Sequence, residues 1–152
     1  MQFLFDEEWS DSAGYLLANI ESGIDTAYTL PLILEEVAFK LLIGKVVEIT
    51  GKKSSWEVRE ILKKDKNIRK QAYTVVLSFS EYIQKLTSKG LRIEPFLTED
   101  LLLGLKIGSR YGIMTADAIL VAFAIRRNIR TIATFDEDFK LVEEIKVLNL
   151  RK

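Results

Sequence analysis

The chain has 152 residues, of which 48% are hydrophobic and 29% charged, a composition typical of one globular domain. Its 22 basic and 22 acidic residues cancel, so the net charge provides no general attraction to nucleic acid or to a membrane. Cysteine and histidine are absent, which excludes disulfides, zinc fingers, thiol nucleophiles, Ser-His-Asp triads and HExxH zinc sites. An enzyme made from these residues would depend on carboxylates, which suit hard cations such as Mg²⁺ or Mn²⁺.

The sequence contains no pattern typical of a membrane or exported protein. The first residues, "MQFLFDEEWSD", carry acids where a signal peptide would carry basic residues. The longest uninterrupted apolar run, Ala118 to Ile125, has eight residues, whereas a spanning helix needs about twenty. We therefore expect a soluble protein of the reducing cytoplasm that does not enter a membrane.

The first third of the chain predicts two helices around a short strand. Residues 10–22 have the capping and apolar spacing of a helix that ends at Gly23, and residues 24–30 are β-prone. Pro31 suits the first turn of a helix that we expect to stop near Gly44. Residues 45–53 give no clear pattern.

Residues 54–89 predict one or two further helices of two different characters. The segment 51–70 holds eight basic and three acidic residues, a local charge of +5. It either contacts phosphate groups or forms a solvated helix face, and the pattern favours neither. The following "AYTVVLSFSEYIQKL" is strongly apolar, so we expect it in the core.

The last third alternates strands and helices. We expect strands at 91–97, 130–134 and 145–150, separated by a helix capped by Thr98, an apolar helix from Thr115 to Arg127, and a helical turn over 138–144. This alternation predicts an α/β fold in one domain, 1–152, with helices on both faces of a largely parallel sheet. Sites in such sheets lie beyond the carboxyl ends of the strands.

Asp117 is the acid whose surroundings most favour a function. It lies in "MTADAILVAFAI", near the start of an apolar helix, with no cation at i+3, i+4 or i−4. An unpaired charge among apolar residues needs a metal or another partner. The alternative is an exposed first-turn acid that the helix dipole stabilises.

Three other acids have simpler structural explanations. Glu36 has Lys40 at i+4, the favourable orientation for a solvated ion pair, and the pattern alone favours that role. Asp136 follows a strand, where a turn aspartate is common, and Asp138 suits the N-cap of "FKLVEE". Thr134 either closes the strand or donates its hydroxyl to a carboxylate.

These motifs together resemble the PIN domain, of the kind found in VapC-like toxin ribonucleases. The matching elements are an acidic helix after a strand, "LPLILEEVAFKL"; an apolar helix opened by "YGIMTADAILVAFAI"; and a strand that ends in "TIATFDEDF". The resemblance extends from about Ser10 to the C-terminus. It implies a three-layer α/β/α fold with a mostly parallel central sheet.

The resemblance also assigns roles to particular acids. It implies that Glu36, Asp117 and Asp136 are catalytic and hold Mg²⁺ or Mn²⁺, with Asp138 as a further ligand and Thr134 in support. It raises Glu36 from a solvated pair to a metal ligand, because "E-V-A" follows Glu36 and not Glu35.

The chain departs from the family pattern at its beginning. PIN nucleases open with a strand that ends in a metal-binding aspartate, whereas "MQFLFDEEWSDSA" resembles the segment after the next helix. We favour the interpretation that this strand lies upstream of Met1. Alternatively, "MQFLFD" replaces it and Asp6 becomes the metal ligand.

Two functions follow from these observations. The first is a metal-dependent endoribonuclease, the toxin of a toxin–antitoxin pair, which implies an RNA substrate, an antitoxin protein and a homodimer. Phosphate contacts would come from the basic segment, with Lys63, Lys64, Lys66 and Arg69 as candidates. The second is a catalytically inactive PIN-like module that binds RNA or protein.

Overall fold

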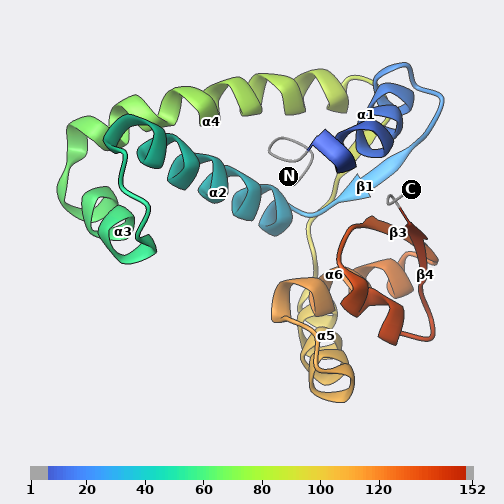
Figure 1. Ribbon diagram of the computed structural model, residues 1–152. Coiled ribbons are helices and arrows are strands. Elements are labelled where there is room, and N and C mark those ends of the chain that lie inside the picture. Colours follow the sequence, from blue (N-terminus) through green and yellow to red (C-terminus); the bar gives the residue numbers. More distant parts are fainter. Residues whose placement is uncertain (1–6, 150–152) are drawn as a thin grey trace.

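The computed structural model describes residues 7–149 and shows a three-layer α/β/α domain (Figure 1). Helices cover both faces of short strands: α1 and α4 pack on one face of the first strand pair, and α6 packs on the second pair. The elements are α1 (Glu7–Glu21), β1 (Ala27–Thr29), α2 (Pro31–Thr50), α3 (Ser55–Lys64), α4 (Lys66–Thr87), β2 (Leu91–Ile93), α5 (Thr98–Tyr111), α6 (Thr115–Arg126), β3 (Thr131–Thr134), the 3-10 helix η2 (Glu137–Leu141) and β4 (Lys146–Asn149).

The strand pairs of the described residues are parallel, as predicted, but they form two separate sheets. β1 pairs with β2, with Ala27 opposite Leu91, and β3 pairs with β4, with Thr131 opposite Lys146. The strands are also shorter than predicted: residues 24–30 contain three strand residues, and so do residues 91–97. A short strand suffices here because most of the apolar surface is buried by helices.

The open edges of β1 and β3 line a common cavity of about 440 Å³. Peptide groups in a strand point alternately to its two sides. The amide of Ala27 donates to Gly90 on the β2 side, so the main chain of Tyr28 points away from β2. By the same alternation, the main chains of Thr131 and Ala133 point away from β4. All three residues line the cavity, which therefore lies in the plane of the strands between the two sheets.

The prediction that α2 ends near Gly44 is wrong. The helix continues to Thr50 because Leu42 and Val46 are buried against α3 and α4, and this packing outweighs the low helix propensity of one glycine. It ends at Gly51, whose φ of 68° is the left-handed conformation that glycine adopts without strain.

The prediction that the apolar half of α4 lies in the core is also wrong. Of its residues 72–86, only Ala72 and Leu86 are buried, whereas Tyr73 and Leu77 are exposed. α4 runs alongside α2 as an outer helix (Figure 1), so one side of it has no protein layer above it. Burial depends on how many elements pack around a helix, and the periodicity of one helix does not encode that number.

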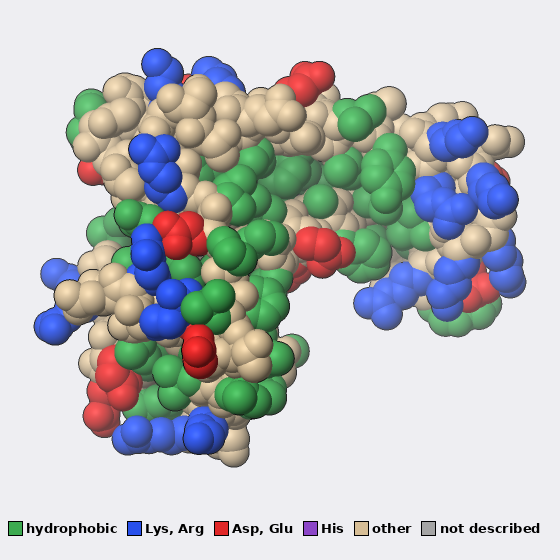
Figure 2. Space-filling view, turned by 180° about the vertical axis from the view of Figure 1, so that it is seen from behind, with side chains coloured by type: hydrophobic (Ala, Val, Ile, Leu, Met, Phe, Trp, Pro, Cys, Tyr) green, Lys and Arg blue, Asp and Glu red, His purple; other side chains and the backbone are tan. Residues whose placement is uncertain are grey.

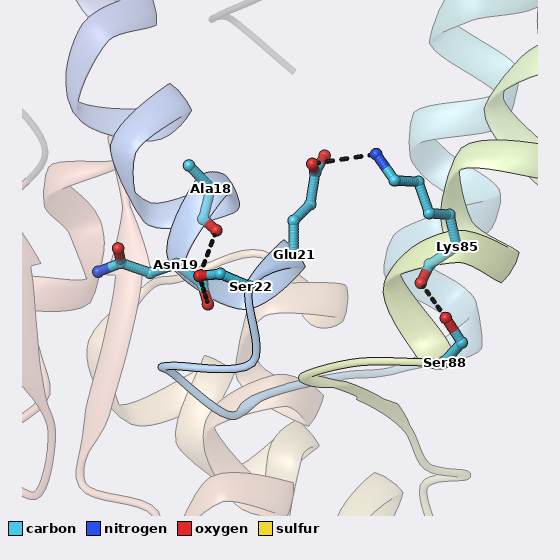
Figure 3. A network of polar contacts seen from close by, with 6 residues as sticks. All are labelled: Ala18, Asn19, Glu21, Ser22, Lys85 and Ser88. Atoms are coloured by element: carbon cyan, nitrogen blue, oxygen red, sulfur yellow. Dashed lines mark hydrogen bonds and ion pairs between the residues drawn. The ribbon is translucent and has the colours of Figure 1, made fainter.

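Polar contacts tie the end of α1 to α4 (Figure 3). The carboxylate of Glu21 lies 3.1 Å from the ammonium group of Lys85, and the hydroxyl of Ser22 donates to the carbonyl of Ala18. Burial and the neighbouring Glu21 raise the pKa of Tyr82 to about 12. The Glu21–Lys85 pair joins α1 to α4, whereas the Ser22 hydroxyl bonds within the end of α1 itself; α1 forms a wall of the site.

The pair α5 and α6 forms the other helical layer. A buried aspartate, Asp100, accepts two hydrogen bonds from Arg126, at 2.6 and 2.8 Å, and one from the amide of Leu97, at 2.7 Å. The Asp100–Arg126 ion pair fixes the start of α5 against the end of α6, and Asp100 takes the N-terminal capping role that we predicted for Thr98.

Within the described residues, no single helix is long and apolar enough to cross a membrane. Only α5 and α6 taken together, bent by 117°, reach the required length and composition.

Candidate active site

Three of the predicted acids line one cavity of about 340 Å³ beyond the carboxyl ends of β1 and β3. They are Glu36, Asp117 and Asp136, and Thr134 lines the same cavity. The remaining walls are mostly apolar and come from α1, α2, α6, β3 and η2: Ala13, Leu16, Leu17, Ile33, Val37, Leu120, Ile132 and Phe139, among others.

Glu36 reaches the cavity because α2 begins directly after β1. Leu30 is the N-cap and Pro31 the first helical residue, so Glu36 lies in the second turn on the side that faces the cavity. Glu35 is exposed and does not line the cavity. One residue of difference turns a helical side chain by about 100°, which separates the two glutamates.

Asp117 has other carboxylates close to it. It lies in the first turn of α6 and is partly buried. Burial raises its pKa, and the neighbouring Asp136, Glu36 and Asp138 raise it further, while Lys40 lowers it. Negative charge therefore exceeds positive charge around this group, and a bound cation would relieve the excess.

Asp136 is held in place by the turn that follows β3. Its amide donates to the hydroxyl of Thr134 (3.0 Å), and its carboxylate accepts from the amide of Asp138 (2.9 Å). Asp136 is therefore the N-cap of η2, and the assignment of that cap to Asp138 is wrong. With Asp138 as its cap the helical turn would begin at Phe139, but it begins two residues earlier, at Glu137, so the cap position is Asp136.

Lys40 belongs to the site, although we treated it only as a partner of Glu36. Its ammonium group lies 2.5 Å from Glu36, and it is the single cation among the described residues that line the cavity. The i,i+4 spacing predicted the Glu36–Lys40 ion pair but not that the pair lines the cavity. The position follows only from the way α2 packs beside α6.

Comparison with known proteins shows the family of this chain. The sequence profile of the PIN domain matches residues 3–145. The chain belongs to the PIN domain family. Ribonuclease VapC6 of Methanocaldococcus jannaschii is 31% identical to this PIN domain over 119 residues, which cover 78% of this chain and 72% of that protein. The predicted resemblance is thus confirmed, and it supports a nuclease or toxin role.

The donor set of this PIN domain suits a divalent cation, and PIN nucleases generally depend on one. No three acidic side chains of the described residues lie close enough together to hold one ion. Glu36 is paired with Lys40, and one oxygen of Asp136 accepts a hydrogen bond from the amide of Asp138. Cation binding would require Glu36 to exchange Lys40 for the ion.

The other predicted residues lie elsewhere. Asp6 falls outside the described residues. Lys63 and Lys64 share Glu60, at 3.5 and 2.7 Å, and Arg69 donates to the carbonyl of Leu62 at 2.8 Å. Lys66 is exposed and enters no ion pair within residues 7–149.

Proposed function

We propose that this PIN domain is an endoribonuclease that hydrolyses phosphodiester bonds with Mg²⁺ or Mn²⁺. The observation that carries the proposal is the convergence of Glu36, Asp117 and Asp136 on one cavity, where burial and mutual repulsion raise the pKa of Asp117. This crowding of carboxylates is unfavourable without a cation, and a bound cation would relieve it.

In this proposal Glu36, Asp117 and Asp136 hold the cation, and Asp138 adds negative charge at the rim. The ion would lower the pKa of a water molecule and neutralise charge on the phosphate. Thr134 holds the Asp136 turn through the amide–hydroxyl bond, which keeps that carboxylate at the carboxyl edge of β3. The apolar walls of the cavity reduce the local dielectric constant and strengthen each of these interactions.

In the absence of a cation and substrate, the ammonium group of Lys40 forms an ion pair with Glu36. With Glu36 among the residues that would hold a cation, Lys40 would be free to pair with a phosphate oxygen of the RNA. The exposure of the two side chains, 58% for Lys40 and 45% for Glu36, leaves room for this exchange. Lys40 is thereby a substrate-binding residue in the proposal.

The relative's name supports RNA as the substrate, and the VapC resemblance supports a toxin that an antitoxin protein restrains. We further propose a homodimer in the cytoplasm, where the absence of cysteine causes no loss of stability. Asp6 remains a candidate fourth ligand.

The Glu36–Lys40 pair also supports a second function, a PIN module that binds RNA without cutting it. If Lys40 is a permanent substitute for the cation, the site is closed to metal. The measured metal affinity separates the two functions, because the inactive module would bind Mn²⁺ no better than a control protein.

The decisive experiment compares Mn²⁺-dependent cleavage of a mixed RNA pool by the wild-type chain and by Asp117→Asn. The matched control is Glu143→Gln, which removes an exposed carboxylate outside the cavity. We expect cleavage that EDTA abolishes, a loss of at least about 100-fold in Asp117→Asn because a charge-stabilising group is removed, and no change in Glu143→Gln.

The outcomes discriminate clearly. Cleavage that persists in Asp117→Asn contradicts the proposed site. No cleavage by the wild-type chain, together with no Mn²⁺ binding by calorimetry, favours the inactive module.

A further inference from the structure

The end of the domain formed by residues 52–70, here called the basic tip, carries a concentration of positive charge. It comprises the loop after α2, helix α3 and the first turn of α4, and it lies at the far end of α2 from β1 (Figure 1). Figure 2 shows Lys and Arg side chains gathered over this end. The charge of the segment is +5, against zero for the whole chain.

The acids of the basic tip are already used within it. Glu57 pairs with Lys52 at 3.0 Å, Glu60 holds two lysines, and Asp65 accepts the amides of Asn67 and Ile68 as the N-cap of α4. These acids therefore neutralise few of the remaining cations. Four basic side chains of the tip are exposed and form no ion pair with the described side chains of residues 11–148: Lys53, Arg59, Lys66 and Lys70.

An exposed tryptophan lies among these cations. Trp56 is 71% exposed, although a side chain of its size normally gains about 1.5–3 kcal/mol or more from burial. Helical spacing puts it on the same face of α3 as Arg59 and Lys63, opposite Val58 and Leu62, which pack against α2 and α4. Folding therefore does not use the indole ring.

We propose that the basic tip is a second binding site for single-stranded RNA, separate from the carboxylate cavity. Trp56 stacks on a base, and Lys53 and Arg59 contact the flanking phosphates. An aromatic platform between cations is the arrangement that binds single strands without sequence preference, because every base has a π face. The ligand class rests on the proposed function, since RNA is the substrate of the cavity.

The helix that connects the two sites sets the length of RNA required. α2 carries Glu36 near its start and ends at the basic tip fourteen residues later, roughly 20 Å along the axis. An RNA of several nucleotides reaches both, so the tip would retain substrate while the cavity acts on it.

Protein is the less suitable partner for this surface. The cores of protein interfaces are depleted of charged residues and gather apolar ones. On the exposed face of α3 the neighbours of Trp56 are charged: Arg59, Lys63 and Glu60, whose carboxylate is paired with Lys63 and Lys64.

The test uses Trp56 fluorescence in EDTA, where cleavage does not occur. The chain has two tryptophans, so a Trp9→Phe background leaves Trp56 as the only reporter. Titration with a uridine oligonucleotide of about twenty nucleotides is expected to quench the emission. Each lost phosphate contact should reduce the slope of log K against log salt by about 0.7.

Matched variants separate specific contacts from general charge. Lys53→Gln with Arg59→Gln is expected to weaken binding and to lower the salt slope by about 1.4, the sum for two contacts. The control, Lys89→Gln with Lys106→Gln, removes two exposed cations outside the tip and should leave both unchanged. Trp56→Ala, measured by anisotropy of a labelled oligonucleotide, should lose roughly 5- to 150-fold in affinity.

Each outcome supports or overturns the inference. The inference is overturned if the oligonucleotide does not quench Trp56 emission, or if the two double variants weaken binding equally. It is also overturned if raising the protein concentration quenches the emission without RNA, which would indicate contact between copies of the chain. Quenching without metal-dependent cleavage would support RNA binding at the basic tip and reject the proposed nuclease function. Cleavage without quenching would do the reverse.

Discussion

Gly104→Ala tests how packing between α5 and α6 positions the site. A Cβ atom at this position would lie 2.9 Å from both the Cα and the N of Ile119, whereas ordinary contacts are 3.4–4 Å. The main chain of α6 would therefore have to move by roughly 0.5–1 Å. Such overpacking typically costs about 1–3 kcal/mol.

A second glycine provides the control. Gly14 lies in α1, and a Cβ atom there meets nothing within 4 Å. Both variants gain about 1 kcal/mol of helix propensity, so their difference isolates the overpacking. In urea unfolding followed by circular dichroism, we expect Gly104→Ala to be about 1–3 kcal/mol less stable than Gly14→Ala.

The same substitution should reduce cleavage, because Ile119 and Asp117 lie on one helix. A displacement near 1 Å at a reacting group can cost on the order of 100-fold in rate. The reasoning is refuted if Gly104→Ala and Gly14→Ala have equal unfolding free energies, because the main chain of α6 would then move away from the new Cβ atom at no cost in stability.

Three further predictions concern charge and exposed strand edges. Asp117→Asn should stabilise the metal-free protein at neutral pH, because the raised pKa of Asp117 in the folded state makes its ionisation there unfavourable. The advantage of the variant over wild type should disappear below about pH 4, where the carboxyl is protonated in both states. It should also disappear in saturating Mn²⁺. An unchanged thermal midpoint in EDTA would contradict this. Asp100→Asn should destabilise the protein, because the buried side chain at position 100 loses its charge-assisted hydrogen bonds from Arg126. Arg126 lowers the pKa of Asp100, so this stability is present above about pH 4 and is lost as the pH falls; a pH-independent difference between the two proteins would be inconsistent with the pair. In hydrogen exchange, the amides that face the cavity between the sheets should exchange faster than those bonded to the paired strands, and equal protection would show that the edges are covered in solution. These amides belong to Tyr28, Thr131 and Ala133.

Much of the site could be predicted because its elements are local. A strand followed at once by a helix or a turn places the next acids at the carboxyl edge, and this rule brought Glu36 and Asp136 to the same side. Asp117 stood out because it has no local cation in an apolar helix. The preference for Glu36 over Glu35 came from the resemblance, and the structure places Glu36 at the cavity.

The errors have a common cause in contacts between distant segments. Gly44 did not end α2 because α3 and α4 pack on its second half. The buried pair of Asp100 with Arg126 joins residues 26 apart, so no local spacing indicates it. The same limit applied to Lys40, whose place at the cavity depends on α6.

Composition and the pattern of neighbouring residues were enough to predict the alternation of helices and strands, the family and the absence of histidine and thiol chemistry. The parallel pairing was inferred from that alternation. Three features became known only from the folded domain: the strands form two sheets with open edges, α4 is an outer helix, and Trp56 stays exposed beside cations. These features depend on how many elements surround a given surface, and that number is a property of the assembled domain.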